Sequence, residues 1–307
     1  MKAARIHQFG SPDMIVVEDV PKSEPGAGEV LIRVAAAGVA PWDEIIREGK
    51  SKVSPRPPLT LGSDLSGTVE ATGTGVAQFK RGDDVFGVTN PQFCGAQAEY
   101  AVASAQMIAR KPARLSYLEA ASVPVVAVTA WQMLFEYAKA QPGQSVLILG
   151  AAGNVGAYAV QFAGRARLNV IALVGSKDVE FVRGLGAQKI VDYQSETFDN
   201  ASPPVDAVLD LVGGQTRERS VSVLKPEGIL VSVVTDGPLP HHPNVRSVFF
   251  YAEVTTERLN TITPLLDRGE VRPQVGTVLP LGDVRAAHAM LAGAPHKRGK
   301  IVLQIAG

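Results

Sequence analysis

The chain of 307 residues is 46% hydrophobic and 20% charged, so it can bury a sizeable core and is long enough for two domains. Its 30 basic and 30 acidic residues cancel, which argues against a nucleic-acid partner and against attraction to an anionic membrane. The beginning of the chain lacks the apolar stretch of a signal peptide, no run approaches the roughly 18 apolar residues of a spanning helix, and Cys94 is the single cysteine. We therefore expect a cytoplasmic protein without disulfides or a membrane partner.

The first 110 residues are rich in glycine and proline and contain short apolar or alternating runs, such as residues 29–34 and 65–71. Short runs separated by turn residues are typical of strands. This part of the sequence predicts a compact β-rich domain.

Longer patterns follow, beginning with a helical run over residues 117–138. Apolar strand-like runs then alternate with helical segments, which predicts an α/β fold with a doubly wound parallel sheet of the Rossmann type. Because these runs are apolar throughout, both faces of the sheet should be covered by helices. The predicted strands are residues 145–149, 170–174, 189–191, 207–211 and 229–233.

A last helix is predicted over residues 257–267, after which strand and turn patterns return and end with a strand over residues 298–305. The order is therefore β-rich, α/β and again β-rich. This order predicts a Rossmann domain at 121–264 inserted into a split substrate domain at 1–120 and 265–307.

The segment from Ser145 to Ala163 contains a buried strand, a turn of small residues and a helix in direct succession. Gly153 would let the main chain approach a diphosphate, Gly156 would let the helix pack closely on the strand, and Ala151 stands at the place of the usual first glycine. The alternative is a tight turn whose glycines serve packing alone. A dinucleotide site predicts phosphate contacts from Ala152, Gly153, Asn154 and Val155.

The end of the second predicted strand, Val174, is followed by Gly175, Ser176 and Lys177 rather than directly by an acid. An acid at this place binds the ribose of NADH, whereas a base tolerates the 2′-phosphate of NADPH. We predict NADPH, with its 2′-phosphate on Ser176 and Lys177. The alternative is that both residues cap the next helix while Asp178 meets the ribose. Tyr193 is expected to stack near the same adenosine, or else to be an ordinary surface tyrosine.

With these features the sequence resembles, almost end to end, the zinc-free quinone oxidoreductase (ζ-crystallin-like) group of the medium-chain dehydrogenase/reductase superfamily. The matching stretches are residues 25–34, 37–43, 61–73, 82–87, 95–100, 128–132, 145–163 and 298–303.

The resemblance implies that the β-rich domain is GroES-like and that the cofactor lies in a cleft between the domains. It also implies that Thr129 lies near the nicotinamide or its ribose phosphate and that the main chain at Val212 and Val233 lines the nicotinamide side. Phe249, Phe250 and Tyr251 would close over the cleft. Related enzymes form homodimers through the cofactor domain, and we expect the same here.

Zinc-dependent members of the superfamily hold their metal with a cysteine and a histidine at the places that Ala40 and Ser63 take here. One cysteine and five scattered histidines do not readily supply the three or four ligands that zinc requires. We therefore expect no metal. Without a Lewis acid, the reaction should suit acceptors that take a hydride readily, such as quinones or, alternatively, alkenals and enones.

The candidate pocket residues by resemblance are Ala40, Trp42, Asp43 and Ser63. Ala40 departs from the asparagine that is common in the group. Trp42 would stack a planar acceptor or serve as a wall residue. Asp43 would anchor the loop, and the alternative is that it hydrogen-bonds a ribose or passes a proton, although an exposed aspartate is ionised at pH 7 and is a poor acid unless burial raises its pKa. The alternative of another class is a non-catalytic NADPH-binding sensor or structural protein.

Overall fold

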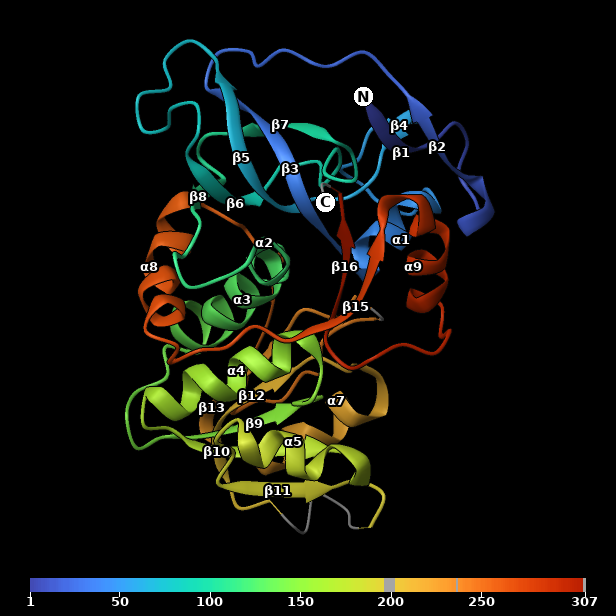
Figure 1. Ribbon diagram of the computed structural model, residues 1–307. Helices are drawn as coiled ribbons and strands as arrows, with labels where there is room; N and C mark the ends of the chain where they lie inside the picture. The colour runs from blue at the N-terminus through green and yellow to red at the C-terminus, as the bar shows by residue number, and fades with distance from the viewer. Residues whose placement is uncertain (196–201, 236, 306–307) are drawn as a thin grey trace. The chain divides into compact units, whose positions relative to one another are not determined.

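A computed structural model describes residues 1–195, 202–235 and 237–305 of the protein, and Figure 1 shows its elements. The chain divides into two compact units. Unit 1 contains Met1–Val125 and Val254–Gly307, and unit 2 contains Val126–Glu253. The predicted insertion of one domain into a split second domain is therefore confirmed.

The division falls inside helix α3 (Pro124–Trp131) and before helix α8 (Thr256–Asp267). Helix α8 belongs to unit 1 because it packs on strand β8 (Ile108–Arg110) and because the Thr256 hydroxyl donates to the carbonyl oxygens of Ala105 and Ile108. The boundary expected at 264/265 therefore differs from that of the compact unit.

Unit 1 is built from two sheets. A three-stranded sheet has the order β2-β1-β4, and a seven-stranded sheet has the order β15-β16-β3-β5-β6-β8 with β7 also paired to β3. The strands are β1 (Lys2–Ile6), β2 (Ile15–Asp19), β3 (Glu29–Val39), β4 (Leu59–Thr60), β5 (Asp64–Thr72), β6 (Asp84–Val88), β7 (Tyr100–Ser104), β8, β15 (Val275–Pro280) and β16 (Lys300–Gln304). The helices are η1 (Pro12–Met14), α1 (Pro41–Arg47), α2 (Tyr117–Ala121), α8, η5 (Leu281–Asp283) and α9 (Val284–Leu291).

The end of the chain returns to its beginning in this unit. Strand β16 pairs antiparallel with β3, with Val302 opposite Gly38, so the red end of the chain lies beside the blue β3 in Figure 1. Gly38 leaves no room for a side chain, since a Cβ there would stand 2.9 Å from the Lys300 Cε and from the Asp64 Cβ. The last strand, β16, is thus held directly against β3.

Unit 2 contains one six-stranded sheet with the order β11-β10-β9-β12-β13-β14, and every pairing is parallel. This order is that of the Rossmann fold, as predicted. The strands are β9 (Ser145–Leu149), β10 (Asn169–Val174), β11 (Lys189–Asp192), β12 (Val205–Asp210), β13 (Leu224–Ser232) and β14 (Arg246–Phe249). The helices, besides α3, are η2 (Gln132–Tyr137), α4 (Asn154–Arg165), η3 (Ser176–Asp178), α5 (Val179–Gly184), α7 (Gly214–Ser220) and η4 (Val221–Val223).

The helical run expected over residues 117–138 consists of α2, α3 and the π-helix η2. Pro124 has no amide hydrogen and favours the first turn of a helix, so α2 ends before it and α3 begins there. The next amide, of Val125, donates to the buried Asp64 Oδ1 at 3.1 Å. A carboxylate from β5 therefore accepts a hydrogen bond from the first free amide of α3. Helical periodicity in the sequence does not reveal this start of a new helix.

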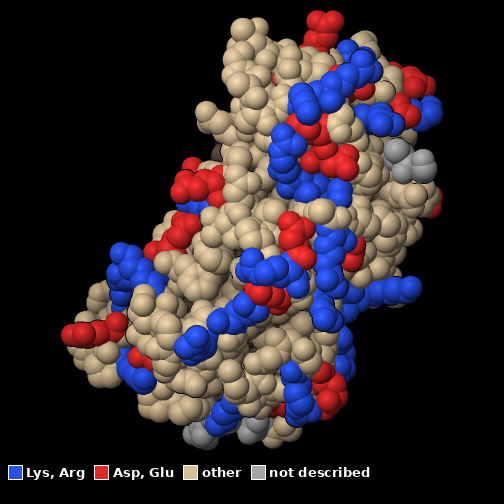
Figure 2. Space-filling view, turned by 60° about the vertical axis from the view of Figure 1, so that its left-hand side comes forward, with Lys and Arg blue, Asp and Glu red and all other residues tan. Residues whose placement is uncertain are grey.

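Within the described residues, no helix combines the length and the hydropathy that a membrane span requires. On the face shown in Figure 2, lysine and arginine side chains are interspersed with aspartate and glutamate. Electrostatic effects on this face should accordingly be local.

Gly156 in α4 offers a test of the strand–turn–helix packing. A Cβ at this position would stand 2.4 Å from the Gly150 carbonyl oxygen and 2.7 Å from the Ala151 Cα, so main chain would have to move. We expect Gly156→Ala to lower the free energy of unfolding by about 1–3 kcal/mol, as in other overpacked sites. Urea unfolding followed by circular dichroism measures this change.

The matched control is Gly164→Ala in the same helix, where the added Cβ would meet the Gly186 carbonyl oxygen at an ordinary 3.8 Å. This variant should be neutral or more stable by up to about 1 kcal/mol, because alanine favours the helix. Equal effects of the two substitutions would contradict the packing argument.

Candidate active site and cofactor-binding residues

The carboxyl ends of the parallel strands in unit 2 form one edge. Along it, Asp192 of β11 is opposite Val174 of β10, Leu149 of β9 is opposite Asp210 of β12, and Asp210 is opposite Ser232 of β13. Open α/β sheets bind their ligands at this edge. The loops that follow these strand ends contain most of the predicted cofactor-binding residues, namely Ala152, Gly153, Asn154, Val155, Ser176, Lys177, Tyr193, Val212 and Val233.

The turn between β9 and α4 begins at Gly150, which has a φ of +74°. Residues with a side chain rarely adopt this conformation. A Cβ at Gly150 would also stand 2.9 Å from the Val212 Cγ2. The sequence argument assigned the first glycine's place to Ala151, whereas the left-handed conformation is at Gly150.

Helix α4 begins after Gly153 with the free amides of its first turn, and that turn contains no acidic residue. A Cβ at Gly153 would meet only the Gly150 carbonyl oxygen, at 3.3 Å, so no neighbouring side chain comes within 4 Å of this position. Free amides and the positive end of a twelve-residue helix suit a phosphate group. The residues present therefore fit a dinucleotide.

A buried carboxylate organises the neighbouring strand ends. Asp210 accepts hydrogen bonds from the amides of Val212 (3.1 Å) and Gly213 (2.8 Å) and from the Ser232 hydroxyl (2.6 Å). The buried Arg217 lies 3.9 Å from the same carboxylate. These contacts fix the turn that carries Val212 and the segment that carries Val233. Sequence reasoning missed Asp210, although an acid that ends an apolar strand was a usable signal.

The three aromatic residues expected over the cleft differ in their surroundings. Phe250 is buried and stacks on Tyr137 with ring centroids 4.2 Å apart, whereas Phe249 and Tyr251 contact each other edge to face at 5.0 Å. Tyr251 is 72% exposed. Thr129 is buried on α3. Within unit 2, Tyr251 is thus the most accessible of these four side chains.

In unit 1, the candidate pocket residues Ala40, Trp42 and Asp43 lie at the start of α1, and Ser63 directly precedes β5. Asp43 is fully buried, and its Oδ2 accepts a hydrogen bond from the Ala40 amide at 2.9 Å, which caps the helix. Among the described residues, Asp43 Oδ1 has no hydrogen-bond partner. Burial raises the pKa of Asp43 to about 7, against the opposing effect of the Lys300 ammonium. The sequence-based expectation was that Asp43 anchors the loop, and its hydrogen bond to the Ala40 amide is a contact of that kind.

Trp42 is held from two sides. Its indole Nε1 donates to the Ser63 hydroxyl at 3.0 Å, and the Lys300 ammonium lies 4.2 Å from the ring centroid. Lys300 in turn donates to Asp64 Oδ2 at 2.7 Å, and both charged side chains are buried. These contacts fix the orientation of the indole. Sequence reasoning did not identify Lys300, because its partners lie more than 200 residues away in the chain.

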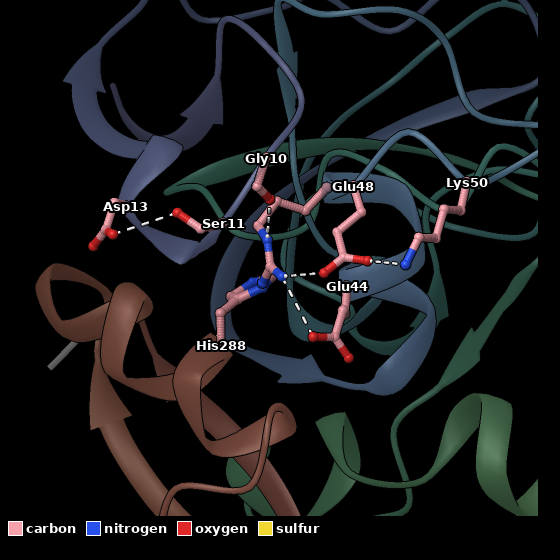
Figure 3. A network of polar contacts seen from close by, with 8 residues as sticks. Gly10, Ser11, Asp13, Glu44, Glu48, Lys50 and His288 are labelled. Atoms are coloured by element: carbon pink, nitrogen blue, oxygen red, sulfur yellow. Dashed lines mark hydrogen bonds and ion pairs between the residues drawn. The ribbon is translucent and has the colours of Figure 1, made fainter.

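The other end of α1 is fixed by Arg47, which is also buried. Figure 3 shows Gly10, Glu44, Glu48 and His288 converging on its guanidinium. Arginine only donates hydrogen bonds, so the His288 Nδ1, 3.2 Å away, accepts one and the proton of the neutral ring is on Nε2. Burial and the Arg47 charge lower the pKa of His288 to about 3. This histidine is therefore neutral and serves to hold α1 against α9.

Ala40 and Ser63 are the residues that the sequence resemblance aligned with the metal ligands of zinc-dependent members. Ala40 is apolar and the Ser63 hydroxyl is bonded to Trp42. A search of the described residues finds no group of three or more histidine, cysteine, aspartate or glutamate side chains arranged to hold a metal ion.

Comparisons with known proteins agree with this geometry. Residues 26–113 match the family model "Alcohol dehydrogenase GroES-like domain", and residues 185–303 match the model "Zinc-binding dehydrogenase". The quinone oxidoreductase of Lama guanicoe is 30% identical, over 99% of this chain and 97% of the relative. The 2-methylene-furan-3-one reductase of Solanum lycopersicum is 34% identical, over 90% of this chain and 71% of the relative.

A solved structure of the quinone oxidoreductase from Coxiella burnetii superposes with a TM-score of 0.90 at 33% identity, covering 100% of this chain and 99% of that one. The chain belongs to the medium-chain dehydrogenase/reductase superfamily, in its quinone oxidoreductase-like group. It is accordingly an oxidoreductase, and membership implies a nicotinamide cofactor.

Asp43 provides a test of the buried cluster around α1. With a folded pKa of about 7 and an ordinary value of 3.8, Asp43 stays protonated in the folded protein while the unfolded chain ionises. Its contribution to stability is therefore complete at low pH and is lost as the pH rises from about 4 to about 7. Asp43→Asn cannot titrate and keeps an acceptor for the Ala40 amide. We expect the stability of this variant relative to wild type to rise by on the order of 3 kcal/mol over that range.

Urea unfolding between pH 4 and pH 8, followed by Trp42 fluorescence in a Trp131→Phe background, measures this difference. Asp19→Asn is the control, because Asp19 is an exposed acid paired with Lys2. If the free energies of unfolding of wild type and Asp43→Asn change in parallel across the whole pH range, Asp43 is not a buried neutral acid.

Proposed function

We propose that this enzyme transfers hydride from NADPH to a quinone-type acceptor without zinc. The observation that carries the proposal is the use made of Ser63. At a place where zinc-dependent relatives need a metal ligand, its hydroxyl accepts a hydrogen bond from Trp42 and so anchors a flat aromatic ring. Such a ring is suited to stacking on a planar acceptor rather than to holding a metal ion.

The bound nicotinamide supplies the hydride. In this proposal the amides at Ala152, Gly153, Asn154 and Val155 bind the diphosphate, and Lys177 binds the 2′-phosphate. Thr129 and the main chain at Val212 and Val233 contact the nicotinamide end, with Phe249, Phe250 and Tyr251 beside it. The hydrogen bonds around Asp210 support this, since they hold Val212 rigidly at the strand end.

Trp42 would stack the acceptor ring, and Ala40 would leave space beside it. A quinone delocalises the incoming charge onto oxygen at once, so orientation and exclusion of water can carry most of the catalysis. Asp43 is turned into the protein, and we therefore expect no indispensable acid–base residue and protonation of the product from water.

A second candidate is the reduction of an activated double bond. It is favoured by the 34% identity to a relative named 2-methylene-furan-3-one reductase, whose name describes a conjugated enone. The same metal-free chemistry serves both acceptors, because the electron pair delivered to an enone carbon also passes to a carbonyl oxygen. We further propose a cytoplasmic homodimer that assembles through unit 2 and needs no metal, membrane or nucleic acid.

A panel of acceptors tests the proposal. Purified protein with NADPH and benzoquinones or naphthoquinones should lose absorbance at the nicotinamide band in an acceptor-dependent manner, and a strong chelator should leave the rate unchanged. Enones turned over far faster than quinones would select the second candidate. Turnover of neither class, or loss of activity that added zinc restores, would contradict the proposal. Trp42→Leu should raise KM for bicyclic quinones, whereas Trp42→Phe should retain most of the binding.

Lys177 tests the choice of cofactor. Lys177→Ala should weaken NADPH binding by about 1–3 kcal/mol, which is typical of losing one charge-assisted contact. NADH binding should change little, because NADH has no phosphate at this place. Fluorescence titration with both nucleotides measures the effect, and equal losses for the two would refute the assignment.

A further inference from the structure

The strand end beside Lys177 contains a carboxylate that the proposed function does not use. Asp192 is the last residue of β11 and is the register partner of Val174, the last residue of β10. The Ser176 hydroxyl donates to Asp192 Oδ2 at 2.5 Å, and the Gln194 amide donates to Oδ1 at 3.0 Å. The acid therefore lies beside Ser176, which is expected to bind the 2′-phosphate of the adenosine ribose.

The surrounding contacts hold this arrangement in place. The Tyr193 amide donates to the Val174 carbonyl oxygen at 3.1 Å, and the Ser176 amide donates to Gln194 Oε1 at 3.1 Å. A Cβ at Gly175 would stand 3.0 Å from the Tyr193 hydroxyl, so the tyrosine packs directly over the loop. The ends of β10 and β11 thus form one recognition surface rather than two separate turns.

Asp192 is an ionised group here. The hydrogen bond from Ser176, and then that from Gln194, lower the pKa of its carboxyl. Within the described part of the chain, the contacts of this carboxylate are hydroxyl and amide groups, with no lysine or arginine among them. Its negative charge is therefore not neutralised by an ion pair.

A carboxylate at this place acts differently on the two nucleotides. A ribose 2′-hydroxyl can donate a hydrogen bond to it, as in dinucleotide folds whose acid ends the second strand. A 2′-phosphate on Ser176 would bring between one and two further negative charges close to it, and like charges at short range repel. Asp192 and Lys177 therefore have opposing effects on the same phosphate.

We infer that Asp192 is a specificity-determining residue, which limits the preference for NADPH and keeps NADH a usable cofactor. This inference rests on the proposed binding of a nicotinamide dinucleotide at the edge of unit 2. In dinucleotide folds the acid that contacts the ribose usually ends the second strand. Here the acid ends β11, the third strand in chain order, and is linked to the expected ribose position by its hydrogen bond from Ser176.

Adenosine fragments test the inference without catalysis. Binding of adenosine 2′,5′-bisphosphate and of adenosine 5′-monophosphate to the full chain is measured by calorimetry for wild type and Asp192→Asn. The variant keeps an acceptor for Ser176 but has no charge, so it should bind the bisphosphate roughly fivefold to tenfold more tightly. Its affinity for the monophosphate should stay the same or fall. The gain should shrink at high salt, because ions screen an exposed charge pair.

Glu180→Gln is the matched control, since it removes one exposed carboxylate in the next helix, where Glu180 pairs with Arg183 instead of facing Ser176. It should leave the ratio of the two affinities unchanged. A merely structural Asp192 would change both affinities alike and would overturn the inference, as would an unchanged ratio. If the wild-type protein binds neither adenosine fragment and neither NADPH nor NADH, the proposed cofactor is wrong, and the inference fails with it. If both fragments bind but Asp192→Asn leaves the ratio of their affinities unchanged, the inference alone is wrong.

Discussion

The buried ion pair between Lys300 and Asp64 connects strand β16, helix α3 and Trp42 in unit 1. Its two charges are 2.7 Å apart and are 1% and 0% exposed. Loss of either partner from such a pair typically costs about 3–5 kcal/mol, because the remaining charge stays buried without compensation. Asp64 also accepts the first free amide of α3, and Lys300 lies under the Trp42 ring. One pair therefore joins the last strand, the helix that leads into unit 2 and the side chain proposed to hold the acceptor.

The same logic applies to helix α1 as a whole. This helix has only seven residues, too few to be stable alone, so its position depends on contacts at its ends. Near its start, Trp42 is fixed by Ser63 and by Lys300 of β16, and at its last residue Arg47 is fixed by His288 of α9. Both C-terminal partners follow unit 2 in the chain. Unit 1 must therefore be completed after unit 2 has been synthesised.

Much of the fold could be predicted from the sequence because apolar runs of three to five residues indicate buried parallel strands, and five of the six strands described in unit 2 follow from them. Strand β14 escaped because its four residues are half-buried or exposed and carry no such run. The break at Pro124 was missed for a different reason, since helical periodicity continues across it. The glycine turn was predicted, but the left-handed conformation of Gly150 was not, because the motif places its first glycine one residue later, at Ala151.

The site itself shows where sequence reasoning reaches its limit. Residues next to each other in the chain, such as Ser176 and Lys177, could be proposed from the sequence because a rule places them after the second strand. Partners from other strands were not, because hydrogen bonds such as that from Ser176 to Asp192 depend on register across the sheet. A ligand at the strand edge meets the ends of several strands at once, whereas a motif describes one. In our proposal one lysine and one aspartate at that edge, fifteen positions apart in the sequence, therefore act on the same phosphate.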